Sequence, residues 1–170
     1  MKYIERKTKR IFDITVALFC IVVFSPLYII CYIAIIIDDG RPALFSQERI
    51  GYKGKAFKIH KFRTMRLDAE ESGPQLYNDN DNRLTVVGSF LRRHHLDELP
   101  QMWNVLKGEM SFIGPRPERK YFIDKIMEHD SRYPMLYQLR PGVTSYATLY
   151  NGYTNTMEKM LRRLELDLYY

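Results

Sequence analysis

The sequence predicts a fold of the α+β class, mainly helical with short β or extended segments. A chain of 170 residues has room for one modest hydrophobic core. Its long apolar run and its amphipathic stretches suit helices, whereas the stretches that alternate apolar and polar residues are short. Hydrophobic residues make up 46% of the chain, against 9 glycines and 8 prolines, which excludes a collagen-like or disordered protein.

The net charge and the positions of the cysteines limit the binding partners and the kinds of site that the chain can have. Lysine and arginine outnumber aspartate and glutamate by 26 to 20, a net charge of +6. This excess suits anionic lipid and phosphate as well as nucleic acid. Both cysteines, Cys20 and Cys31, lie inside one apolar run. Their placement argues against a disulfide scaffold and against a zinc site built on cysteine.

The apolar run covers residues 14–37 and contains no charge. As one helix it would be about 36 Å long, enough to cross roughly 30 Å of hydrocarbon. A cleaved signal peptide fits poorly, because the run is too long and no small-residue cleavage site follows it. A buried core helix is an uncommon use for so long an apolar segment in so short a chain.

Ser25-Pro26 interrupts this run at its midpoint. Pro26 removes a backbone donor and clashes with the preceding turn, so we expect a bend there, with Ser25 bonding a freed carbonyl. Each half is about 18 Å long, too short to cross but long enough to enter and return. For a straight spanning helix, the positive-inside rule would place Asp38, Asp39 and the residues after them outside the cell. The run alone leaves a spanning and a re-entrant helix open.

Short elements follow the run. Alternation from Phe57 to Met65 predicts a strand or an extended segment, and residues 45–51 form a similar stretch rich in aromatic and basic residues. Residues 68–82 are acidic and contain Asn, Gly and Pro, which indicates an exposed loop. Residues 84–95 are spaced as a moderately amphipathic helix.

The next predicted helix runs from Leu96 to Leu106, with Pro100 near its start and Gly108 as its C-terminal cap. Asp97 and Glu98 would then lie in its first turn. The positive end of the helix dipole favours an ionised carboxylate there and a phosphate nearby. Ordinary helix-start chemistry explains the same acidic pair equally well.

A rigid arginine follows in Gly114-Pro115-Arg116-Pro117. The two prolines restrict the backbone of Arg116, so its guanidinium is presented with little conformational entropy left to lose. Such a fork suits bidentate phosphate recognition. A solvated arginine in a proline-rich turn is the alternative.

The C-terminal segment is spaced as an amphipathic helix, with Asn155 and Glu158 as a possible capping pair. Its apolar residues are Met157, Met160, Leu161, Leu164 and Leu168. Such a helix packs on the body of the protein more often than it lies in a membrane interface.

Taken together, these stretches resemble the bacterial sugar transferase family, the small monotopic polyprenyl-phosphate phosphoglycosyl transferases. The resemblance is strongest in Leu96-Asp97-Glu98-Leu99-Pro100-Gln101 and in residues 103–117. The remaining matching segments are residues 9–13, Ser25-Pro26, 45–51, 57–65, 140–144 and 165–170.

The resemblance implies transfer of a phospho-sugar from a nucleoside diphosphate sugar, usually UDP-linked, to undecaprenyl phosphate. UMP leaves, and the lipid diphosphate sugar starts a surface glycan. In the family the aspartate of the Asp-Glu pair is the nucleophile, here Asp97, and carries a covalent phospho-sugar intermediate. Glu98 belongs to the same dyad, and the implied cofactor is Mg²⁺, held by Asp97 and Glu98. Arg92, Arg116, Lys61 and Arg63 are our candidates for binding phosphate.

The resemblance also implies a topology. Residues 1–40 would form a re-entrant membrane helix broken at Ser25-Pro26, and residues 41–170 a compact catalytic domain with amphipathic interfacial helices. Because nucleotide sugars are cytoplasmic, we expect the cytoplasmic face of the bacterial inner membrane. A homodimer is a further expectation, since the family often forms one.

Two departures from the family pattern concern the C-terminal part. Residues 142–153 lack the arginine and alter the aromatic residue usual in the family, which bears on specificity for the sugar or the base. Related sequences usually continue beyond Tyr169-Tyr170 with another amphipathic segment.

Three other functions compete with this interpretation. A membrane-anchored scaffold without chemistry would fit the altered C-terminal motif. A nucleic-acid binder is disfavoured, since anionic lipid and phosphate account for the modest net charge. A zinc enzyme built on His94-His95 is disfavoured because adjacent histidines rarely chelate one ion.

Overall fold

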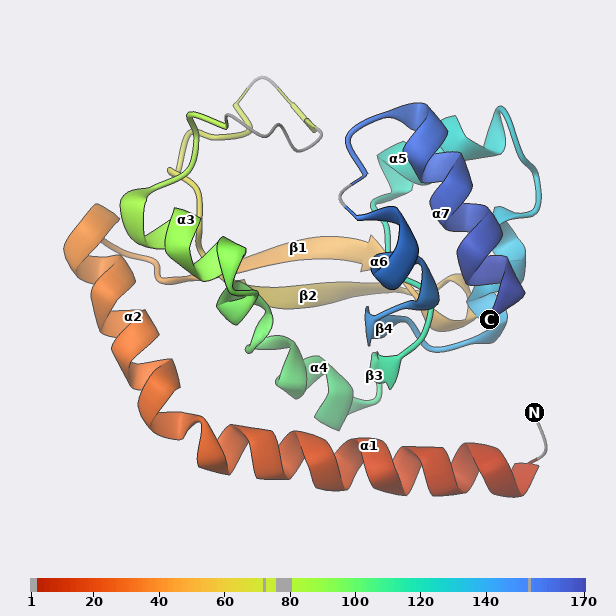
Figure 1. Cartoon of the computed structure of the whole chain (residues 1–170), viewed down its shortest axis with the longest axis horizontal. Coiled ribbons are helices and arrows are strands. Elements are labelled where there is room, and N and C mark those ends of the chain that lie inside the picture. The colour runs from red at the N-terminus through yellow and green to blue at the C-terminus, as the bar shows by residue number, and fades with distance from the viewer. Residues whose placement is uncertain (1–2, 72, 76–80, 153) are drawn as a thin grey trace.

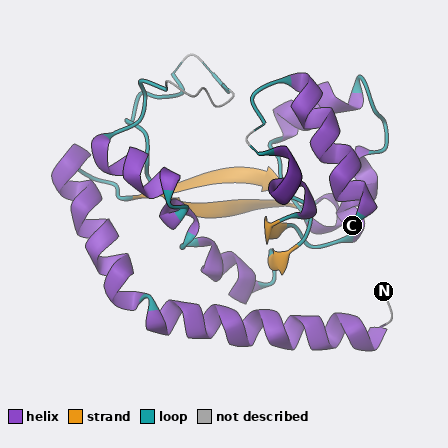
Figure 2. Ribbon diagram, viewed as in Figure 1, coloured by secondary structure: helices purple, strands orange, loops and turns teal. Residues whose placement is uncertain are grey.

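The computed structural model describes residues 3–71, 73–75, 81–152 and 154–170. Helices α1 (Tyr3–Val23) and α2 (Ser25–Asp39) form a bent arm along two sides of a mixed body (Figure 1). The body combines short helices with two small sheets, as Figure 2 shows, which confirms the predicted α+β class. Lys2, Tyr153 and parts of the expected loop at 68–82 lie outside the described residues.

The bend of the arm lies where the sequence predicts it. The axes of α1 and α2 differ by 61°, with Phe24 between the two helices. Pro26 has no N–H to donate to the Val22 carbonyl, and the Ser25 hydroxyl donates to that oxygen instead, at 2.8 Å. Within the described ranges, no helix taken singly has the length and apolarity to cross a bilayer; only the bent pair together reaches them.

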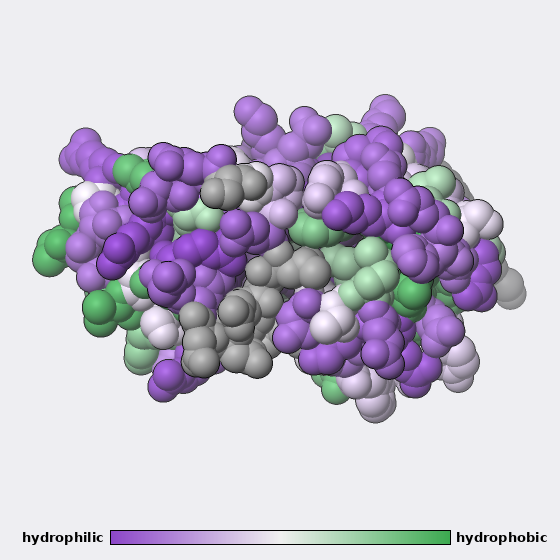
Figure 3. All heavy atoms as spheres, turned by 90° about the horizontal axis from the view of Figure 1, so that it is seen from above, coloured by the Kyte–Doolittle hydropathy of each residue, from purple (hydrophilic) through white to green (hydrophobic). Residues whose placement is uncertain are grey.

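Much of the arm's apolar surface is exposed. Ile37 is 80% exposed and Val22 70%, while Asp13, Ala17, Cys31 and Ile35 are buried against the body. The other exposed large apolar side chains of the arm are Ile11, Phe12, Leu18, Phe19, Val23, Phe24, Ile29, Ile30, Tyr32 and Ile33. Hydrophobic side chains accordingly gather at the α2 end of the molecule (Figure 3, left). An apolar surface of this extent is typical of contact with a lipid or protein partner.

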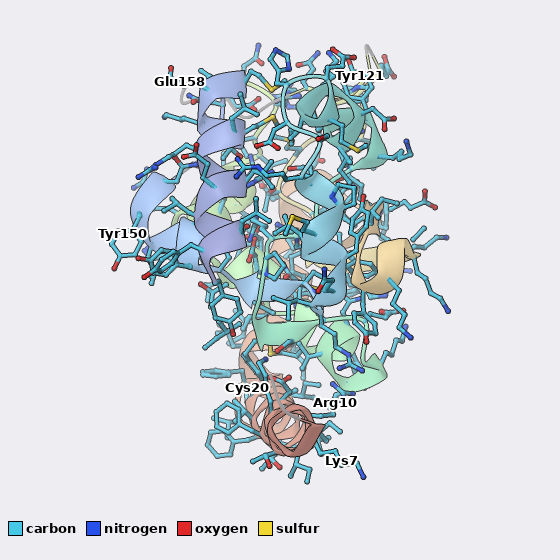
Figure 4. The ribbon with its side chains drawn as sticks, turned by 90° about the vertical axis from the view of Figure 1, so that its right-hand side faces the viewer. Lys7, Arg10, Cys20, Tyr121, Tyr150 and Glu158 are labelled. Atoms are coloured by element: carbon cyan, nitrogen blue, oxygen red, sulfur yellow. The ribbon has the colours of Figure 1, made fainter. Side chains whose placement is uncertain are left out.

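Polar contacts dock α1 onto the body. Arg10 points from α1 toward the body (Figure 4), and its guanidinium donates to the carbonyl oxygens of Val105 and Leu106 at 2.6 and 2.8 Å. Asp13, 3% exposed, accepts from the Ser111 hydroxyl and from the backbone N–H of Phe112. These bonds satisfy buried polar groups of both partners.

Strands β1 (Leu44–Ile50) and β2 (Ala56–Phe62) form an antiparallel hairpin, with Leu44 opposite Phe62. A 3-10 turn, η1 (Tyr52–Gly54), lies between them. Ile59 is buried and Lys58 exposed, as the predicted alternation requires.

Helix α3 (Val86–Arg93) begins two residues later than predicted, with the Thr85 hydroxyl as its N-terminal cap. Leu84 instead forms a β-bridge with Met65. The prediction that a helix begins at Leu96 was wrong. The helix expected from Leu96 is a 3-10 turn, η2 (Leu96–Glu98), followed by α4 (Gln101–Lys107).

The residues on either side of η2 explain why η2 and α4 do not form one helix. His95 adopts a left-handed conformation before η2, and Pro100, which lacks an N–H, is the N-cap of α4. Gly108, with φ of 84°, ends α4 as predicted.

The second small sheet pairs β3 (Ser111–Ile113) in parallel with β4 (Gly142–Thr144). The backbones approach closely at Gly114, where an added Cβ would lie 2.2 Å from the Arg140 carbonyl oxygen. Only glycine allows this approach, which brings the segment after β3 beside β4.

The remaining elements are α5 (Lys120–Met127), η3 (Tyr133–Gln138), α6 (Tyr146–Asn151) and α7 (Met157–Tyr169). Met160 and Leu164 of α7 pack into a core with Phe122 and Ile126 of α5, so this face of α7 lies on the body. The predicted Asn155 cap was wrong: Thr156, one residue later, caps α7 by accepting from the Lys159 N–H.

Candidate active site

Four of the residues predicted for the site come together from three parts of the chain. Glu98 Oε1 accepts from Lys61 Nζ at 2.7 Å and from Arg116 Nη2 at 2.5 Å. Lys61 Nζ also lies 3.8 Å from Asp97 Oδ2. Lys61 comes from β2, the acidic pair from η2, and Arg116 from the loop between β3 and α5. The cluster therefore holds two carboxylates against two cations.

Asn104 joins β2 to α4 and so brings Lys61 toward η2. Its side chain accepts from the His60 N–H at 3.0 Å and donates to the Lys58 carbonyl at 2.7 Å. Asn104 is fully buried and also donates to Glu109. No local pattern in the sequence predicts a role for this asparagine, because its partners on β2 are distant in sequence.

Arg116 is held by contacts to its backbone and side chain. Its N–H donates to Asp167 Oδ2 of α7 at 3.2 Å, and Nη1 lies 3.4 Å from the Val143 carbonyl oxygen. Two residues on, buried Glu118 pairs with Arg49 and, at 2.6 Å, with Arg163 of α7. Asp167 and Glu118 thus support the loop that carries Arg116, and no local pattern in the sequence predicts a role for either.

Charge and burial shift the pKa values of this cluster in different directions. Burial acts to raise the pKa of Glu98, but the positive charges of Arg116 and Lys61 outweigh it and hold that pKa well below its usual value. Burial lowers the pKa of Lys61, opposed by the charge of Glu98. Glu98 is therefore the ionised partner of both cations.

Asp97 behaves differently from the prediction. Burial raises its pKa, and the nearby charges of Lys61 and Arg92 oppose this rise only in part. The prediction that Asp97 lies in the first turn of a helix was wrong, because Asp97 lies in the short 3-10 turn η2 and α4 begins only at Gln101. The burial of Asp97, which is 4% exposed, dominates.

The acidic pair fits a divalent cation. Asp97 Oδ1 is buried and has no hydrogen-bond partner among the described residues, which is rare for a carboxylate oxygen. Magnesium typically takes one or two protein carboxylates and completes its shell with water and substrate phosphates. Across the described ranges, no three His, Cys, Asp or Glu side chains are grouped so that they could hold a metal ion.

Arg92 and Arg63 complete the predicted phosphate binders. Arg92, in the last turn of α3, lies near enough for its charge to lower the pKa of Asp97. Arg63 is buried elsewhere: its Nη2 donates to the carbonyl oxygens of Asp39 and Gly40 at the end of α2, at 2.8 and 2.7 Å. The structure does not bring Arg63 into contact with the acidic pair.

Two neighbouring features bear on the site. Gln101, the first residue of α4, is fully buried, and neither atom of its amide has a partner among the described residues. The His94 ring lies 4.3 Å from the Phe90 ring between centroids, tilted by 39°, and its Nδ1 lies 2.9 Å from the Phe90 carbonyl oxygen. Both contacts of His94 are therefore made within the end of α3.

Comparison with known proteins gives one family and many relatives. The family described as "Bacterial sugar transferase" matches residues 4–170. An Aeromonas hydrophila UDP-N-acetylgalactosamine-undecaprenyl-phosphate N-acetylgalactosaminephosphotransferase is 39% identical over 95% of this chain and 38% of its own length. An Escherichia coli UDP-glucose:undecaprenyl-phosphate glucose-1-phosphate transferase is 37% identical, over 98% of this chain and 36% of its own length.

A Bacillus subtilis protein named as a candidate undecaprenyl-phosphate N-acetylgalactosaminyl 1-phosphate transferase is 47% identical over 69% of this chain. The match covers 65% of that relative. The chain thus spans between about a third and two thirds of the length of these three relatives.

Proposed function

The chain belongs to the bacterial sugar transferase family, and on that premise we propose that it transfers a phospho-sugar to undecaprenyl phosphate. The donor is a nucleoside diphosphate sugar, with UDP as the expected nucleotide, and UMP is released. One observation carries the proposal: Lys61 and Arg116 share Glu98 beside Asp97, whose Oδ1 has no partner among the described residues.

The cations of the site would counter the charge repulsion that opposes the reaction. A carboxylate and a diphosphate repel each other, so attack requires positive charge at the phosphate. Lys61, Arg116 and Arg92, from three different segments of the chain, would supply it. The reaction exchanges one diphosphate linkage for another, so it is near energetic balance and needs no nucleotide hydrolysis.

We propose two steps. A carboxylate oxygen of Asp97 attacks the phosphorus that bears the sugar, the bond from that phosphorus to the bridging oxygen breaks, and UMP leaves with the electron pair. An oxygen of undecaprenyl phosphate then attacks the same phosphorus, and Asp97 leaves as a carboxylate. Asp97 and Glu98 are the proposed Mg²⁺ ligands, and the bound ion would neutralise phosphate charge.

The arm supports a location at a lipid boundary. Its exposed apolar side chains and its bend at Ser25-Pro26 suit a re-entrant segment that enters and leaves by one leaflet. The proposed side is the cytoplasmic face of the inner membrane, because nucleotide sugars are cytoplasmic. The homodimer expected from the resemblance stays a prediction.

The test is UMP release from a panel of UDP-sugars by the full chain in lipid nanodiscs with Mg²⁺. We expect release from one sugar class, dependent on undecaprenyl phosphate for turnover, and a phospho-sugar adduct on Asp97 by mass spectrometry when the donor is given alone. Absence of UMP release from every donor would favour the non-catalytic scaffold. Full turnover without an adduct would exclude the two-step order.

A further inference from the structure

Helix α2 forms part of the support beneath the acidic pair. Its buried side chains Cys31 and Ile35 share a hydrophobic cluster with Phe62 at the end of β2 and Leu91 of α3. Leu96 and Leu99, the residues on either side of Asp97-Glu98, pack against the same cluster. A shift of α2 therefore bears directly on the turn that carries both carboxylates.

Tyr28 adds a directional contact to this packing. Its hydroxyl donates to the Leu99 carbonyl oxygen, and its ring lies 5.7 Å from the Phe62 ring between centroids. The Leu99 carbonyl also accepts from the Met102 N–H at 3.1 Å, so this oxygen joins the end of η2 to the start of α4. Tyr28 lies two residues beyond Pro26, close to the bend of the arm.

The far end of α2 is tied to the same layer. Arg63 donates to the last carbonyls of the helix, and Asp38 Oδ2 accepts from the Val87 N–H at the start of α3 at 2.9 Å. Arg63 lies two residues after Lys61, and α3 carries Arg92. Both ends of α2 are thus bonded to segments that carry residues of the site.

We propose that Tyr28 is a positioning residue, which transmits the seating of the bent arm to the turn that carries Asp97 and Glu98. The proposal rests on the proposed function for its effect on turnover, but the coupling itself is a property of the fold. Because a nucleophile must be placed to within a fraction of an ångström, a small rotation of η2 lowers the rate without preventing donor binding.

The variant Tyr28→Phe tests this, since it keeps the ring against Phe62 and removes only the hydroxyl. The matched control is Tyr32→Phe, one turn further along α2, where the side chain is 41% exposed. Each is compared with the wild-type full chain in the same lipid nanodiscs. The measurements are amide hydrogen exchange over residues 96–102, kcat and KM for the donor, and thermal unfolding.

We expect Tyr28→Phe to speed exchange in residues 96–102 and to lower kcat about tenfold, with KM within about twofold. Tyr32→Phe changes none of these. Unchanged exchange and unchanged kcat in Tyr28→Phe would overturn the proposal. A loss of activity that accompanies a lowered Tm and is recovered by cooling would also overturn it, because the variant would then act through global stability. If the wild-type chain releases no UMP, the proposed function fails, while the exchange comparison still decides the coupling.

Discussion

Arg116 Nη2 lies 2.5 Å from Glu98 Oε1, an oxygen that also accepts from Lys61. This relationship assigns different tasks to the two neighbouring carboxylates. Glu98 is ionised and fixes two cations, while Asp97 keeps one buried oxygen without a partner among the described residues. The two pKa values are displaced in opposite directions, which is typical of acidic pairs with divided roles.

Asp97→Asn is expected to abolish turnover and to raise Tm. Activity falls at least about 1000-fold because an amide does not form the acyl-phosphate. Burial raises the pKa of Asp97, so the folded state binds its proton more tightly than the unfolded state does. Ionised Asp97 therefore costs stability as pH rises through its folded pKa, and the neutral isostere removes that cost.

Thermal unfolding at neutral pH without divalent ions, beside UMP release, checks both parts. A lower Tm for Asp97→Asn would contradict the assigned pKa direction. Substantial remaining turnover would remove Asp97 from the role of nucleophile.

Glu98→Gln is expected to move the alkaline limb of the kcat profile to lower pH. Burial lowers the pKa of Lys61, and the charge of Glu98 opposes this. Without that charge the pKa of Lys61 falls further, so its positive charge is lost at a lower pH. The same variant should require more Mg²⁺ for half-maximal activity.

The measurement is kcat against pH and against Mg²⁺ concentration, with Glu48→Gln as the control because Glu48 is exposed on β1. If the alkaline limb and the metal dependence both match those of the wild-type chain, Glu98 has only a structural role.

Arg63→Ala is expected to destabilise the fold by about 2 kcal/mol while leaving KM for the donor within about twofold. The guanidinium donates to two carbonyls at the end of α2, and its loss leaves these oxygens without that donor. Denaturant unfolding and donor kinetics provide the measurements, with exposed Arg66→Ala as the control. A tenfold rise in KM at unchanged stability would instead make Arg63 the phosphate binder that the sequence suggested.

Local chemistry explains which features of the fold were predictable. The bend at Pro26, the strand from Ala56 and the Gly108 cap each depend on a few neighbouring residues. The pairing of β3 with β4 joins three-residue strands some thirty positions apart, and neither strand is long enough to show alternation. Short elements of this kind are fixed by tertiary packing, which no local pattern reveals.

The residues of the site divide in the same way, into those that a local motif predicts and those whose position depends on tertiary packing. Asp97, Glu98 and Arg116 lie in motifs that could be recognised, and Lys61 lies beside them in space. Arg63 was predicted to bind phosphate, as Lys61 was, because both are cations in the same short basic stretch. Strand β2 ends at Phe62, and Arg63 reaches α2 instead.

Glu118 provides the last prediction, which concerns acid stability. Burial acts to raise its pKa, but the charges of Arg163 and Arg49 outweigh burial and lower the pKa to about 2 from 4.5. Between these values the unfolded chain binds a proton that the folded chain does not, so the stability from this group is full above about pH 4.5 and is lost as pH falls toward 2.

The difference between the folded and unfolded pKa values of Glu118 corresponds to about 3 kcal/mol of unfolding free energy. In Glu118→Gln that acid-dependent part of the unfolding free energy should be missing, and α7 should be less firmly held to the Arg116 loop. Urea unfolding from pH 2.5 to 6 measures the slope, with exposed Glu128→Gln, which should keep the wild-type slope, as the control. Equal slopes in wild type and Glu118→Gln would mean that the two arginines do not hold Glu118 ionised in the folded state, and the support of Arg116 by α7 would then rest on Asp167.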